Sequence, residues 1–157
     1  MAAWQRLSDN ARQAILAARN LARAQGCGTV SPAHLVLGIL AQDACLAVSI
    51  LRDMGVDTRS LRQHLTDKAA AHATGGQPPD DIDLTVAARQ CMQVASIEAR
   101  KDAGRHGKHL GVDFFVSTAH LLLGLVSPAS TADMKTLRTH GVFYGELREL
   151  LHRALRE

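Results

Sequence analysis

Apolar residues recur every three or four positions between residues 8 and 26, which is the spacing of one helix face. Ser8 at the start of this stretch is typical of an N-cap, and Gly26 is typical of a helix stop. Ser31 followed by Pro32 then combines an N-cap residue with proline at the first helical position. These signals predict two successive helices in the first 40 residues of the chain.

The next thirty residues predict two further helices. One runs roughly from Cys45 to Met54 and ends at Gly55. Asp57 is positioned to cap another helix, which carries Leu61 and Leu65 on its apolar face.

The same pattern of residues recurs in the second half of the chain. Three blocks recur in the same order: residues 7–23 over 84–100, residues 31–40 (SPAHLVLGIL) over 117–126 (STAHLLLGLV), and residues 51–65 over 137–151. The first block matches at an offset of 77 residues and the other two at an offset of 86. The difference of nine places an insertion in the second copy, near residues 104–112. The chain is therefore interpreted as a tandem duplication.

The second copy predicts its own four helices, with N-caps, a stop and a final apolar face at Thr85, Ser117, Gly141, Leu147, Leu150 and Leu151. The predicted fold is all-α: two tandem four-helix repeats packed as a pseudo-twofold bundle. Residues 1–70 form the first repeat, residues 71–83 a linker rich in Gly, Pro and Asp, and residues 84–157 the second repeat. Each repeat is too small to bury a large core alone, so we expect the two to pack together and to bind a ligand where they meet.

Composition narrows the class of protein. Apolar types supply 46% of residues and aromatic types only 3%, which favours an aliphatic helical core. No apolar run approaches the roughly 20 residues that cross a bilayer, and the N-terminus lacks the apolar region of a secretory signal, so we expect a cytosolic protein without membrane contact. The three cysteines (Cys27, Cys45 and Cys91) are odd in number and lack C-x-x-C spacing, which favours reduced, buried side chains.

Charge and polar chemistry point to no catalytic class. The net charge of +3 is mild, and the aromatic residues are too few to stack bases, so a solvated surface is favoured over nucleic-acid binding. No nucleophile and base stand in a recognisable arrangement. We therefore expect neither an enzyme, nor a cofactor, nor a metal site.

Two histidines, His34 and His120, stand at equivalent positions inside apolar runs. Metal binding is one interpretation, but a buried histidine satisfied by a backbone carbonyl is favoured. His106, His109 and Asp113 in the insertion have loose metal-ligand spacing, yet the surrounding glycines favour a mobile loop.

The paired blocks carry a family resemblance. Each copy resembles the Clp N-terminal repeat, the module that precedes the ATPase rings of ClpA- and ClpC-type chaperones. The resemblance lies in three motifs in the same order: an S/T-x-x-A-R helix start, then S-x-A-H-L-x-L-G, then Leu-x-x-x-Gly-Val. The resemblance covers nearly the whole chain except the linker and the insertion. It implies a non-catalytic module that binds substrates, adaptors or peptide ligands, with Clp unfoldase or protease subunits as partners.

The ATPase signature is absent from the chain. No G-x-x-x-x-G-K-[ST] loop occurs before the last residue, Glu157. We therefore expect either a free-standing relative of the N-terminal domain or the N-terminal fragment of a Clp ATPase subunit.

One departure from the family concerns phosphoarginine. ClpC-type domains that recognise this group carry glutamate before the motif histidine, whereas Ala33 and Ala119 stand there in this chain. Alanine offers no carboxylate to grip a guanidinium, so a change of ligand is expected. Ser8 and Thr85 keep the hydroxyls expected beside the phosphate, although simple N-capping is the favoured interpretation of both.

A second family surface binds cyclic peptide antibiotics in ClpC-type domains. The positions that match it by resemblance are Trp4, Arg12, Ile15, Leu16, Leu84, Arg89 and Gln93. Trp4, the only tryptophan, is equally interpreted as a ligand anchor and as a staple on its own helix. Arg12 and Arg89 are either peptide ligands or simply solvated.

Three functional hypotheses follow. The first is an interaction module that acts beside a Clp unfoldase, and co-purification with Clp subunits would support it. The second is a stand-alone protein that sequesters cyclic peptide antibiotics, which nanomolar binding dependent on Trp4 or Arg12 would support. The third is an enzyme or nucleic-acid binder on a borrowed fold, which a salt-steep affinity for DNA would support.

Overall fold

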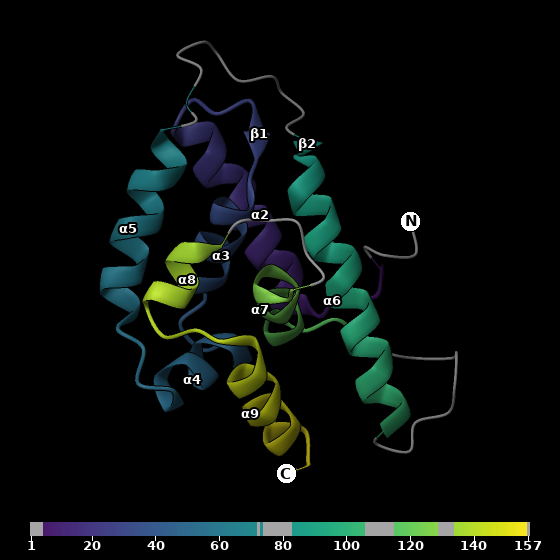
Figure 1. The fold of residues 1–157 in the computed structure, drawn as a ribbon. Helices are drawn as coiled ribbons and strands as arrows, with labels where there is room; N and C mark the ends of the chain where they lie inside the picture. Colours follow the sequence, from purple (N-terminus) through teal and green to yellow (C-terminus); the bar gives the residue numbers. More distant parts are fainter. Residues whose placement is uncertain (1–4, 72, 74–82, 106–114, 129–133, 157) are drawn as a thin grey trace.

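The computed structural model describes residues 5–71, 73, 83–105, 115–128 and 134–156 (Figure 1). Within these ranges the chain forms eight helices and two short strands. In chain order they are α2 (Asp9–Ala24), β1 (Thr29–Val30), α3 (Pro32–Leu40), α4 (Leu46–Asp53), α5 (Thr58–Ala70), β2 (Asp83–Leu84), α6 (Val86–Arg105), α7 (Thr118–Val126), α8 (Lys135–Thr139) and α9 (Tyr144–Arg156).

The helix boundaries follow the capping signals in the sequence. The Ser8 hydroxyl accepts a hydrogen bond from the amide of Ala11 at the start of α2, over 3.2 Å. Three predicted helix stops, Gly26, Gly55 and Gly141, have φ angles of 74°, 76° and 88°. This left-handed conformation favours glycine, so each of these positions ends a helix as predicted.

Four helices come from each copy, α2–α5 from the first and α6–α9 from the second, which confirms the predicted all-α double repeat. Helix α2 packs along α3, and α6 packs along α7 in the equivalent way. Helices α3 and α7 also contact each other, so the two copies meet at the centre of the molecule between α5 on one side and α6 on the other (Figure 1).

Short extended segments of the two copies pair with each other, which the sequence did not predict. Strand β1 of the first copy pairs in parallel with β2, with Val30 opposite Leu84. An isolated parallel bridge joins Leu7 to Val116. Leu7 and Leu84 are equivalent in the duplication, and so are Val30 and Val116, so the same pairing is made twice around the pseudo-twofold axis. Two-residue strands are too short to show alternating polarity in a sequence.

Small aliphatic residues build the core. The largest fully buried side chains in the described ranges are Ile39 and ten leucines, with no aromatic residue among them. The leucines are Leu40, Leu51, Leu61, Leu65, Leu122, Leu123, Leu125, Leu137, Leu147 and Leu151. Cys27, Cys45 and Cys91 are buried and free, as predicted. None of the helices in the described ranges has the length and apolar character needed to span a bilayer.

The predicted linker and insertion lie mostly outside the described residues. Asp83, the last residue of the predicted linker, is an exception, because it belongs to β2 and pairs with Thr29. His106, His109 and Asp113 also lie outside the described part of the chain.

Candidate functional site

Ser8 and Thr85 act as N-caps at the starts of α2 and α6. The Thr85 hydroxyl accepts a hydrogen bond from the Ala88 amide over 3.1 Å, as the Ser8 hydroxyl does from Ala11. Their own amides donate across the pseudo-twofold axis, from Ser8 to the carbonyl of Val116 and from Thr85 to that of Val30, both over 3.0 Å. Each hydroxyl therefore supports a helix start at a junction between the copies.

The predicted ligand residues of the two copies, around Ser8 and Arg12 in the first and around Thr85 and Arg89 in the second, lie at opposite ends of the α2 and α6 pair. Val30, which bonds to the start of α6, follows the end of α2, whereas Val116, which bonds to the start of α2, follows the end of α6. Helices α2 and α6 therefore begin at different ends of the molecule. The structure keeps Arg12 near Ser8 and Arg89 near Thr85 but does not merge the two sets into one site.

Both predicted arginines have local partners. Arg12 donates from Nη2 to the carbonyl of Gln5 over 3.1 Å, and its Nη1 lies 3.9 Å from Oδ1 of Asp9. Arg89 pairs with the carboxylate of Asp83 on the exposed surface. A ligand carboxylate at either position would replace an acidic neighbour that is already present.

The predicted apolar positions divide between core and surface. Ile15, predicted as a ligand contact, is only 4% exposed and its side chain packs in the core. Leu16 is 39% exposed, Leu84 is half-buried and Gln93 is exposed. Trp4 lies outside the described residues.

The outward side of α6 carries a feature that the sequence reasoning missed. Val86 is 70% exposed and Ile97 is 52% exposed, although both are large aliphatic residues. Together with polar residues at helical spacing they form one stripe along the helix. We call this stripe the α6 outer face, and its residues are Val86, Arg89, Gln93, Ile97 and Arg100. The signal was available, because the small residues Ala88, Cys91, Ala95 and Ala99 already satisfy the buried face of the same helix.

The two alanines at the family carboxylate positions are buried. Ala33 is 5% exposed and Ala119 is fully buried, both in the first turns of α3 and α7. Neither position opens to a ligand in this structure.

The equivalent histidines His34 and His120 complete capping boxes. Nδ1 of His34 lies 3.1 Å from the amide of Ser31, and the Ser31 hydroxyl accepts from the amide of His34 in return. His120 makes the same reciprocal pair with Ser117. Each histidine therefore fixes the start of a central helix.

The outer nitrogen of each histidine contacts a side chain, whereas the sequence favoured a backbone carbonyl as the partner. Nε2 of His34 lies 2.9 Å from Oε1 of Gln25, and Nε2 of His120 lies 2.8 Å from Oδ2 of Asp102. Gln25 and Asp102 are equivalent at the offset of 77. The sequence offered no signal for this pairing, because each partner lies outside the helix of its histidine: Gln25 caps the end of α2 and Asp102 lies in α6.

Asp102 joins a third helix to this contact. Its Oδ1 lies 2.9 Å from Nε2 of His152 on α9, and its side chain is only 4% exposed. Burial alone would raise the pKa of Asp102, but the hydrogen bonds and charges of His120 and His152 outweigh it, so the pKa lies below its ordinary value. The second copy thus holds a buried carboxylate between two imidazoles, where the first copy has an amide.

A second buried carboxylate, Glu98, ties α6 to the start of α9. The Tyr144 hydroxyl donates to Oε1 of Glu98 over 2.6 Å, and Arg148 donates to Oε2 over 3.0 Å. Burial, followed by the hydrogen bond to Glu98, raises the pKa of Tyr144 above its ordinary value. These contacts make the inner side of α6 a structural face and leave only its outer face for a ligand.

The described residues offer no cluster of three or more His, Cys, Asp or Glu side chains suited to a metal ion. The buried side chains of His34, His120, Glu98 and Asp102 have the structural partners given above.

Comparisons with known proteins agree with this architecture. The family model described as the Clp repeat (R) N-terminal domain matches residues 6–139. The uncharacterized protein Rv2667 of Mycobacterium tuberculosis is 31% identical over 123 residues, which cover 78% of this chain and 44% of that protein. The chaperone protein ClpB of Oceanobacillus iheyensis is 23% identical over 144 residues, or 92% of this chain and 16% of ClpB. The chain thus spans less than half the length of these curated relatives.

Solved structures share the fold. The Hsp104 N-terminal domain from Candida albicans superposes with a TM-score of 0.74 at 17% identity, covering 96% of this chain and 91% of that one. A ClpV N-domain solved in complex with a VipB peptide has a TM-score of 0.70 at 11% identity, covering 96% of this chain and 87% of that one.

Proposed function

Since this chain belongs to the Clp repeat N-terminal domain family, we propose that it is a non-catalytic module that binds peptide segments of substrates or adaptors for a Clp unfoldase. A ClpV N-domain with the same fold has been solved with a VipB peptide, which supports a peptide as the kind of ligand. In this proposal the two repeats form a rigid scaffold and the ligand binds on their outer helices.

The observation that carries the proposal is the α6 outer face. The large aliphatic side chains of this solvent-facing stripe add nothing to the core, so they are available to contact an apolar part of a ligand. Val86 and Ile97 supply two apolar anchors, and Gln93 between them supplies an amide for peptide backbone groups. Arg89 adds a guanidinium beside Val86, already paired with Asp83.

Rigidity of the scaffold supports the same use. The inner side of α6 is held by buried contacts to α7 and α9 through Asp102 and Glu98. A face presented by a fixed helix loses little conformational entropy on binding, which favours recognition of an extended or helical peptide.

The unfoldase itself would be supplied by ATPase modules, either in the same polypeptide or in a separate subunit. Purification of the native protein from cytosol distinguishes these arrangements. A longer polypeptide with an ATPase region identifies a domain of a Clp subunit, whereas a short one recovered with Clp subunits identifies a free-standing module.

Selection from a random dodecapeptide display library tests the proposal. We expect a family of selected peptides with apolar residues at positions that match Val86 and Ile97, and saturable binding by fluorescence anisotropy. Competition by a cyclic peptide antibiotic would identify the antibiotic as a ligand of the same face. Failure to select any peptide that binds saturably would contradict the proposal.

A further inference from the structure

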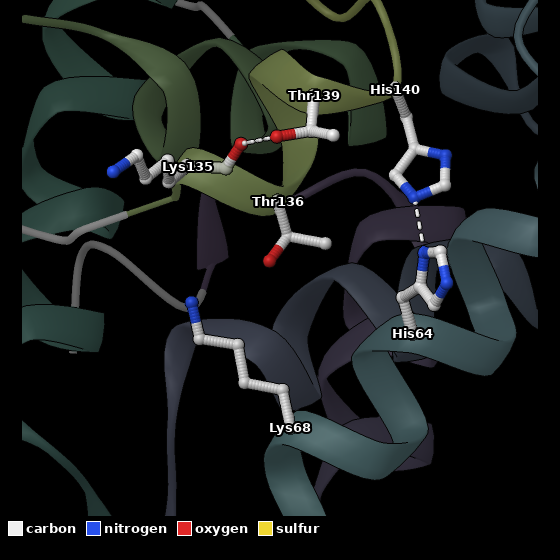
Figure 2. Close-up of a pocket in the computed structure, with 6 residues that line it drawn as sticks. All are labelled: His64, Lys68, Lys135, Thr136, Thr139 and His140. Carbon is white, nitrogen blue, oxygen red and sulfur yellow. Dashed lines mark hydrogen bonds between the residues drawn. The ribbon is translucent and has the colours of Figure 1, made fainter.

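A polar hollow lies between α5 of the first copy and α8 of the second, away from α6. It has a volume of about 300 Å³ and is lined by His64, Lys68, Lys135, Thr136, Thr139 and His140 (Figure 2). This volume is at the lower end of the range for small-molecule sites, which begins at about 300 Å³. Because each copy contributes one wall, the hollow exists only when the two repeats are packed together.

Two imidazoles form one end of the hollow. Nδ1 of His64 lies 2.6 Å from Nε2 of His140, and the ring centroids are 4.8 Å apart. At this distance the two nitrogens share one proton, since two bare lone pairs or two N–H groups would repel.

The other end carries cationic and hydroxyl groups. Figure 2 shows Lys68 extending from α5 on the Thr136 side of the hollow, with the two imidazoles on the opposite side, while the Lys135 ammonium points away from the histidines. Thr139 donates its hydroxyl proton to the Lys135 carbonyl over 3.0 Å, which leaves Thr136 as the hydroxyl placed to donate to a ligand. None of the six lining residues is acidic.

This set of groups fits an anion better than a metal ion. Two imidazoles supply only half of the four ligands that zinc commonly takes, and the Lys68 ammonium group in the same hollow repels a cation. An ammonium and a hydroxyl are instead both donors to phosphate oxygens. We propose that the hollow between α5 and α8 binds the phosphate group of a small molecule, with Lys68 and Thr136 as its ligands and the His64–His140 pair closing one end of the site.

Titration of the full chain with inorganic phosphate tests this assignment, at pH 7 and constant ionic strength, followed by ¹H–¹⁵N NMR. We expect saturable shifts at His64, Lys68, Thr136 and His140. Lys68→Gln is expected to weaken binding at least about tenfold, because a hydrogen bond from a charged donor is lost. Thr136→Val is expected to weaken binding while keeping the net charge.

The matched control is Lys101→Gln, which removes an exposed lysine from α6 and is expected to leave phosphate affinity unchanged. A parallel titration with glycerol 3-phosphate identifies the source of the group: tighter binding than inorganic phosphate indicates an organic phosphate, and equal binding indicates the free ion. Three results would each overturn the assignment: no saturable shift in the hollow, equal loss of affinity in Lys68→Gln and Lys101→Gln, or saturable binding of Zn²⁺ at the histidines without phosphate binding.

Discussion

Gly38 on α3 lies against the backbone of Ala14 on α2, so closely that a Cβ added to Gly38 would be 2.0 Å from the Ala14 carbonyl oxygen. The second copy repeats this contact, since a Cβ on Gly124 would be 2.2 Å from the carbonyl oxygen of Cys91. The glycine in each H-L-x-L-G block is therefore required by the close approach of two helix backbones. This contact sets the distance between the paired helices of each repeat.

Replacement of Gly38 by alanine should destabilise the protein, because the contacting atoms are backbone and cannot rotate away. We expect the free energy of unfolding to fall by about 3 kcal/mol, the upper end of the usual range for overpacking. Chemical denaturation followed by circular dichroism measures this change.

Gly145→Ala is the control for that experiment. Gly145 lies in α9 with no atom within 4 Å of an added Cβ, so alanine there should stabilise the helix by about 0.5–1 kcal/mol. A Gly38→Ala protein as stable as the Gly145→Ala protein would show that α2 and α3 do not approach closely.

Local signals made the helices predictable, whereas contacts between distant segments were not. Ser8, Pro32 and Gly55 act through neighbouring backbone, so their roles follow from spacing alone. The pairing of Val30 with Leu84 depends on how the copies pack, which periodicity does not report.

The site shows the same division between local and long-range information. The capping roles of Ser8 and Thr85 were predictable from their places before helices. The partner of His120 was not, because Asp102 stands 18 residues away on another helix. The exposure of Val86 and Ile97 could have been inferred from the small residues that fill the opposite face of α6.

Asp102→Asn should lower stability in a pH-dependent way. A carboxyl whose pKa is lowered by folding stabilises the protein above its unfolded pKa, which is about 3.9, and loses that contribution as pH falls through the folded value. We expect the variant to be less stable by about 2 kcal/mol at pH 7. The difference should shrink as the pH falls below about 4, from the unfolded pKa towards the lower folded value.

Urea denaturation between neutral and acidic pH measures that difference. Asp67→Asn, at an exposed position of α5, serves as the control and should change stability little at any pH. A deficit of the Asp102→Asn protein that stays constant down to acidic pH would argue against the two histidines as the cause.

Tyr144 is the only tyrosine in the chain, so ultraviolet absorbance reports its ionisation directly. Its pKa is raised by burial and by Glu98, and we expect a titration midpoint above about 10 in the folded protein. The midpoint should decrease in Glu98→Gln and return to about 10 in denaturant. Since folding raises this pKa, the stability linked to it is present below pH 10 and is lost as pH rises through the folded value. An unchanged midpoint in Glu98→Gln would contradict the hydrogen bond.

The first repeat alone should not fold. Residues 1–71 would lose the bridge from Leu7 to Val116, the pairing of Val30 and the bond from the Ala47 amide to Thr118 Oγ1. The apolar surface of α3 that packs on α7 would also face water. We expect no cooperative thermal transition by circular dichroism, in contrast to the full chain. A cooperative transition in this fragment would show that the copies are independent domains.

The α6 outer face is the centre of the functional proposal, and its variants test it most directly. Val86→Ser combined with Ile97→Ser removes both exposed apolar anchors without touching the core, while Leu155→Ser removes an exposed leucine from α9 as the matched control. The measurement is the dissociation constant of a selected peptide by fluorescence anisotropy. We predict at least about tenfold weaker binding in the double variant, as expected for loss of two anchors, and unchanged binding in Leu155→Ser. Equal affinity of the double variant and the unaltered chain would contradict peptide binding at this face.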